Sequence, residues 1–145
     1  MSIFTYCPNL TTFHESLGII GSGKSTFFAI LALGDFFQKG EAVASAIKEK
    51  CGFTPSLINP RFASGLDEEL LHGLKKNHQL VLTLEDGILE GGFGQKIASF
   101  YGPNKMLVKN YGLEKQFYDR YNPDELLEEC GMTTERIVEY VKSIL

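Results

Sequence analysis

The chain has 145 residues, of which 43% are hydrophobic and 22% charged, proportions typical of a single globular domain. Its formal net charge of −4 repels phosphate backbones, so nucleic acid is disfavoured as a partner. The longest apolar run, Phe27–Leu33, is far too short to cross a bilayer, and the first residues lack the pattern of a secretory signal. We therefore expect a cytoplasmic protein with neither a nucleic-acid nor a membrane partner.

The first 26 residues are predicted to be a lead-in. Their one candidate element is an edge strand at Ser16–Ile20, and no clear hydrophobic period precedes it. Residues 27–145 are predicted to form the folded domain.

Four short apolar runs in that domain are predicted to be strands. Because they are apolar on both faces, they suit strands that are buried between two layers of helices. These runs are Phe27–Leu33, Ser56–Asn59, Leu80–Leu84 and Met106–Val108.

The segments between and after these runs show helical spacing of apolar residues and recognisable helix ends. The alternation of strands and helices predicts an α/β sandwich with a mostly parallel sheet, whose strand ends form any crevice. The predicted helices are 36–50, 67–76, 93–101, one that starts at Asn122-Pro123 and ends at Gly131, and one that opens at Thr133.

The segment Gly18–Ser25 fits the phosphate-loop pattern G-x-x-x-x-G-K-[ST]. In that function Gly18, Gly23 and the intervening amides cradle phosphates, Lys24 reaches the terminal phosphate, and Ser25 holds magnesium. The segment before it is a poor buried strand and the run after it is short. A glycine-rich turn into a strand is therefore the preferred interpretation, and a small nucleotide-binding protein is the alternative.

Five ordered pieces of sequence carry a family resemblance. They resemble the C-terminal domain of transketolase-type thiamine-diphosphate enzymes, and within it the 1-deoxy-D-xylulose-5-phosphate synthase branch. The similarity covers about residues 27–145, with departures at Asp119–Tyr121 and Ala63–Gly65. The pieces are Ala29–Gly34 with Gly40-Glu41, Leu57–Phe62 with Leu66–Leu70, Thr83–Gly87 with Gly91–Gly94, Tyr111–Leu113 with Phe117, and Glu125–Leu127 with Gly131-Met132 and Ile137.

This resemblance implies a three-layer α/β/α sandwich with a five-stranded mixed sheet. It also implies a support and dimerisation domain, without catalytic residues, that associates as a homodimer or with the cofactor-binding domains of its enzyme. The parent enzyme is expected to use thiamine diphosphate and Mg²⁺. The Gly-Asp-Gly motif for that cofactor is absent here, since Glu85-Asp86-Gly87 lacks the first glycine. We therefore expect no cofactor bound by this chain alone.

Glu85 and Asp86 follow a buried run and allow two interpretations. As paired carboxylates they are candidates for acid–base work. As structural groups they accept hydrogen bonds from the amides of the following glycine-rich turn or cap the next helix. The second interpretation is preferred, because no basic or nucleophilic partner is near them in sequence.

The remaining candidates concern anions and metals. Gly91, Gly92 and Gly94 either let a phosphate approach a helix N-terminus or permit close packing and positive φ in a tight turn, and the second interpretation is preferred. Arg61, at a predicted strand end, binds an anion in the crevice or forms a salt bridge. A stand-alone anion-binding module is thus a third possible function. The three cysteines and three histidines lack metal spacing, so we expect reduced thiols, solvated imidazoles and no metal site.

Overall fold

The computed structural model describes residues 28–145, which contain four strands and five helices in alternating order. The strands lie close to the predicted runs, and every predicted helix is present. The strands are β1 (Phe28–Ala32), β2 (Ser56–Ile58), β3 (Leu80–Ile88) and β4 (Leu107–Leu113), and the helices are α1 (Phe36–Cys51), α2 (Glu68–Asn77), α3 (Phe93–Tyr101), α4 (Pro123–Glu129) and α5 (Thr134–Ile144).

The four strands form one sheet in the order β2-β1-β3-β4. All three pairings are parallel, with Ile30 of β1 opposite Leu57 of β2 and Leu82 of β3. The predicted mostly parallel sheet is confirmed, and the described residues contain four strands where five were expected. Each connection between these strands passes through a helix, which returns the chain to the same edge and imposes parallel pairing.

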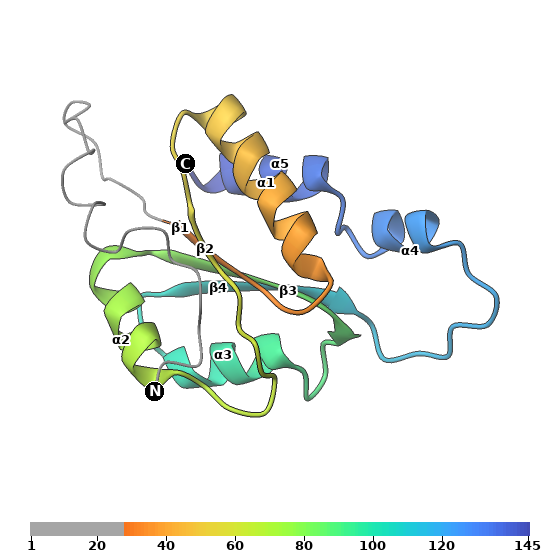
Figure 1. The fold of residues 1–145 in the computed structure, drawn as a ribbon, viewed down its shortest axis with the longest axis horizontal. Coiled ribbons are helices and arrows are strands. Elements are labelled where there is room, and N and C mark those ends of the chain that lie inside the picture. Colours follow the sequence, from red (N-terminus) through yellow and green to blue (C-terminus); the bar gives the residue numbers. More distant parts are fainter. Residues whose placement is uncertain (1–27) are drawn as a thin grey trace.

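Helices cover both faces of the sheet, which confirms the three-layer sandwich (Figure 1). On one face, α1 and α5 pack over Ile30, Leu82 and Leu84. On the other face, α2 and α3 pack over Ala29, Leu31 and Val81 through side chains such as Leu71 and Ile97. Central strand β1 is buried along its whole length because it lies between two strands and two helical layers.

Two strands run further than their apolar patterns predicted. β3 continues through Glu85-Asp86-Gly87 to Ile88, which pairs with Leu113 after an irregularity in register that begins beyond Leu84. The segment Asn110–Gly112, which follows the predicted run Met106–Val108, lies inside β4. Asp, Asn and Gly have low strand propensity, so a sequence pattern ends the strands too early. The pairing between the ends of β3 and β4 stabilises these residues in the extended conformation despite their low strand propensity.

The helix ends agree with their sequence signals. Gly52 closes α1 with a φ of 81°, and the side chains of Asp67, Asn122 and Thr133 accept backbone hydrogen bonds at the starts of α2, α4 and α5. Within residues 28–145, no helix combines the length and apolar character needed to cross a membrane.

Candidate functional site

The glycine-rich turn between β3 and α3 contains the buried carboxylate of Glu85, which is only 3% exposed. Its Oε2 accepts a hydrogen bond from the Phe93 amide at 2.9 Å, and its Oε1 accepts one from the Gly94 amide at 2.8 Å. These amides belong to the first turn of α3, whose N–H groups have no partner within the helix. The preferred interpretation of Glu85, as an acceptor for the amides of this turn, is confirmed.

Two glycines allow this carboxylate to reach the helix. A β-carbon at Gly92, the residue before α3, would collide with the Ile88 carbonyl and lie 2.8 Å from each Glu85 oxygen. A β-carbon at Gly94 would collide with Thr83 Oγ1 and lie 2.8 Å from the Asn110 side chain. These glycines are therefore required for close packing.

Gly91 serves the same turn in a different way. It has a φ of 74°, in the left-handed region that favours glycine, and its amide donates a hydrogen bond to Gln95 Oε1 at 2.5 Å. Open space surrounds the position where a side chain would stand. Backbone conformation, rather than packing, therefore requires glycine at position 91.

Thr83 and Asn110 belong to the same cluster, although sequence reasoning did not select them. Buried Thr83 donates from Oγ1 to Asn110 Oδ1 at 2.8 Å and thereby joins β3 to β4. Both residues border Gly94. The available signal was Thr83, a polar residue inside the apolar run Leu80–Leu84, since a polar group in a buried strand must find a partner. Asn110 lies beyond the predicted run Met106–Val108 and had no such signal.

The position filled by Glu85 is the one that a bound anion would take at a helix N-terminus. The dipole and free amides there favour negative charge, and the chain supplies that charge itself. Among the described residues, no positively charged side chain hydrogen-bonds to this carboxylate. The arrangement thus fastens α3 to the sheet and leaves the carboxylate oxygens engaged with backbone amides.

Asp86 and Arg61 lie outside this cluster. Both side chains are exposed, and no hydrogen bond or ion pair within residues 28–145 joins Arg61 to Glu85. Glu85 and Asp86 point into different environments, since one is buried and its neighbour in the strand is exposed. The described structure does not bring the predicted carboxylate pair and Arg61 together as one site.

The alternative phosphate loop, with Gly18, Gly23, Lys24 and Ser25, lies outside the described residues, as do the lead-in 1–26 and its candidate edge strand. A nucleotide site of this kind also needs an acidic strand end to help hold magnesium, and the candidate, Glu85-Asp86 at the end of the run Leu80–Leu84, is within the described part of the chain. Its buried member, Glu85, is hydrogen-bonded to α3. In the described residues, no group of three or more His, Cys, Asp or Glu side chains is placed to hold a metal.

These residues do not fit a site for a diphosphate and its magnesium ion. Such a site requires several oxygen ligands around the metal. Here the Glu85 oxygens already accept amide hydrogen bonds, and Asp86 is exposed beside Gly87 without further ligands from the described residues.

His78 differs from the solvated histidine that was expected. It follows α2, its Nδ1 lies 3.2 Å from the Leu74 carbonyl, and its Nε2 lies 3.1 Å from Ser56 Oγ on β2. The carbonyl oxygen can only accept, so Nδ1–H donates the hydrogen bond to it, and Nε2 of the neutral ring accepts a hydrogen bond from the Ser56 hydroxyl. Burial lowers the pKa of His78, although the hydrogen bond to Leu74 opposes this shift.

Solved structures of transketolases resemble this fold. A split-gene transketolase, described as an inactive beta4 tetramer, superposes with a TM-score of 0.68 and 24% identity, over 81% of this chain and 38% of that one. Transketolase from Campylobacter jejuni superposes with a TM-score of 0.54 and 20% identity, over 85% of this chain and 18% of that one. The fold is therefore that of a domain found in transketolases.

Sequence comparison defines the family. The model of the family described as "Transketolase, C-terminal domain" matches residues 23–137, and the chain belongs to this family. The 1-deoxy-D-xylulose-5-phosphate synthase of Alkaliphilus oremlandii is 34% identical over 130 residues, which are 85% of this chain and 21% of that enzyme. The synthase of Shouchella clausii is 34% identical over 124 residues, which are 84% of this chain and 20% of that enzyme. The chain thus spans about a fifth of the length of these relatives.

Proposed function

We propose that residues 27–145 act as the support and dimerisation domain of a 1-deoxy-D-xylulose-5-phosphate synthase or a closely related transketolase-type enzyme. Family membership over residues 23–137 and 34% identity to the Alkaliphilus synthase support this assignment. The observation that carries the structural role is the Glu85 cluster. Its carboxylate and its tightly packed glycines hold α3 on the sheet rather than facing a substrate.

In this proposal the chain is not catalytic by itself. The parent enzyme uses thiamine diphosphate and Mg²⁺, works in the cytoplasm in the formation of isoprenoid and thiamine precursors, and holds its cofactor on other domains. The present domain associates with those domains or with a second copy of itself. The Glu85 region does not fit a diphosphate–magnesium site, which supports the proposal that other domains hold the cofactor.

Calorimetry tests the absence of a cofactor site. Titration of thiamine diphosphate with Mg²⁺ into the 145-residue chain is expected to give no heat of binding at micromolar concentrations. The A. oremlandii synthase serves as the positive control under the same conditions. Saturable micromolar binding by the isolated chain would overturn the non-catalytic role.

A domain exchange tests the assignment to this enzyme class. In the A. oremlandii synthase, the region that matches this chain is replaced by residues 27–145, and a second variant lacks the region. The exchanged enzyme is expected to bind thiamine diphosphate and retain synthase activity within about tenfold of the natural enzyme, because the 34% identical domain supplies the same fold. The deletion variant is expected to lose activity. Equal inactivity of the two variants would reject the proposal.

A further inference from the structure

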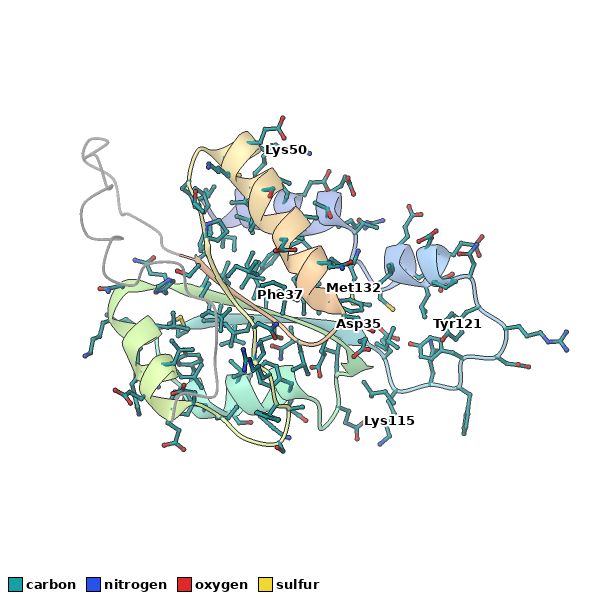
Figure 2. All side chains as sticks on the ribbon, viewed as in Figure 1. Asp35, Phe37, Lys50, Lys115, Tyr121 and Met132 are labelled. Atoms are coloured by element: carbon teal, nitrogen blue, oxygen red, sulfur yellow. The ribbon has the colours of Figure 1, made fainter. Side chains whose placement is uncertain are left out.

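The loop between β4 and α4 presents an unusual surface. In Figure 1, this loop and α4 extend away from the sandwich, beyond the ends of β3 and β4. Within the loop, Phe117 is wholly exposed and Tyr121 is 56% exposed. Figure 2 shows Tyr121 on this projection. Ile88, which is 42% exposed, pairs with Leu113 directly before the loop. Exposed apolar and aromatic side chains that occur together mark interaction surfaces.

Contacts inside the loop hold it in shape. The Tyr118 hydroxyl donates to the Glu114 carbonyl at 3.0 Å, and the Tyr118 and Tyr121 rings meet edge to face with centroids 6.0 Å apart. Arg120 has a φ of 52°, a conformation that non-glycine residues rarely adopt and that is common at functional sites. Lys115 pairs with Glu90 at 2.9 Å and ties the loop to the turn after β3. The loop is therefore preorganised with Phe117 facing solvent.

The charge beside these aromatic residues is concentrated and negative. Residues 119–129 contain five carboxylates and one arginine, so their net charge is −5 + 1 = −4, which equals that of the whole chain. All five carboxylates are exposed. They are Asp119, Asp124, Glu125, Glu128 and Glu129. A partner that covers Phe117 and Tyr121 must therefore bring an apolar pocket with a positively charged rim.

This charge also distinguishes between two kinds of partner. In a two-fold symmetric contact between two copies, the same surface meets itself, and the acidic rims would oppose each other. A different protein surface avoids that repulsion. The A. oremlandii relative contains about four-fifths of its length outside the region matched by this chain, and that remainder is the available heterologous surface.

We propose that Ile88, Phe117 and Tyr121, with the acidic rim of residues 119–129, form the surface that docks onto the remaining domains of the enzyme. This β4–α4 surface is recognised by an apolar pocket lined by lysine or arginine. The inference rests on the proposed function and specifies its contact. Phe117 is the central anchor, since exposed aromatic residues that become buried dominate interface energies.

The exchanged A. oremlandii enzyme described above, with a protease site placed at the junction, tests this docking. After cleavage, the two pieces of the wild-type protein are expected to remain associated in size-exclusion chromatography. Phe117→Ala is expected to raise the dissociation constant at least about tenfold, as for an interface anchor. Phe117→Leu, which keeps most of the apolar area, is expected to restore most of the affinity.

Two controls separate docking from folding. In the isolated chain, Phe117→Ala is expected to leave the melting temperature unchanged, because the side chain is wholly exposed. Leu107→Ala removes another exposed apolar side chain, at the opposite end of β4, and is expected to leave the affinity unchanged. Asp119→Lys is expected to slow association several-fold at low salt, an effect that high salt removes.

The possible outcomes are distinct. An exchanged enzyme that is as inactive as the deletion variant rejects the proposed function and this inference with it. The inference alone is rejected if the exchanged enzyme is active but its cleaved pieces separate. It is also rejected alone if the exchanged enzyme is active and its pieces bind equally tightly with and without Phe117→Ala. Sedimentation of the isolated chain gives the last outcome. If the chain is a dimer and Phe117→Ala makes it a monomer, the surface binds a second copy of the chain, and the inference is rejected.

Discussion

At the scale of single residues, Glu85 illustrates how backbone amides stabilise a buried carboxylate. Two amides of α3 donate to its oxygens, and the positive end of the helix dipole lies beside it. The Thr83 hydroxyl donates a hydrogen bond to the Asn110 side chain on the adjoining strand. Sequence reasoning favoured this structural use of Glu85 because no basic partner was near in sequence, but it did not identify Thr83 or Asn110.

Replacing the carboxylate tests this interpretation. Glu85→Gln keeps the shape but presents an NH₂ group to one of two amide donors, so that donor loses its acceptor. The free energy of unfolding is expected to fall by about 1–3 kcal/mol. Urea denaturation followed by circular dichroism measures the change. Asp86→Asn, at the exposed neighbouring position, is expected to stay within about 0.5 kcal/mol of wild type. Equal effects of the two substitutions would contradict the role of Glu85.

At the scale of elements, the prediction of helices and strands succeeded where the local signals are strong. The end of α1 follows from Gly52 and the start of α4 from Asn122-Pro123, because these residues act through their own backbone and side chain. The ends of β3 and β4 were predicted too early. Ile88 and Leu113 pair across the sheet, and only a neighbouring strand makes that extension favourable.

The contact between α2 and β2 through His78 gives a pH-dependent prediction. The pKa of His78 is lowered in the folded chain, so below about pH 6.5 the unfolded chain binds more protons at this group. Stability is therefore expected to increase as pH rises from the lowered folded pKa to about 6.5, and to gain no more from His78 above that value.

Urea midpoints measured across this pH range check the prediction. His78→Gln keeps a polar group next to Ser56 but does not titrate, so its stability is expected to vary less with pH than that of the wild type. Identical pH profiles for the two proteins would show that His78 does not contribute.

At the scale of the whole molecule, the question is whether the phosphate-loop pattern at Gly18–Ser25 and the sheet form one nucleotide site. A second, acidic element is needed to hold magnesium in such a site. In the described residues the candidate for that element is Glu85-Asp86, and Glu85 is already bound to α3. Within the described residues, the buried carboxylate of the sheet is therefore already engaged and does not complete the site.

ATP with Mg²⁺ is accordingly expected to leave the melting temperature of the 145-residue chain unchanged, since a ligand that binds the folded state would raise it. Lys24→Ala is expected to melt at the same temperature with or without ATP. A rise in melting temperature that depends on ATP concentration and disappears in Lys24→Ala would instead support nucleotide binding.

The sequence by itself determined the order of strands and helices, most helix ends and the family. Those properties depend on local hydrophobic period, capping residues and ordered motifs that can be read along the chain. Only the tertiary structure decided the strand order β2-β1-β3-β4, the hydrogen bond between Thr83 and Asn110, and that Arg61 takes no part in the Glu85 contact within the described residues. These outcomes depend on contacts between residues that are distant in sequence or belong to different elements. Their energies come from hydrogen bonding and packing that no local pattern specifies.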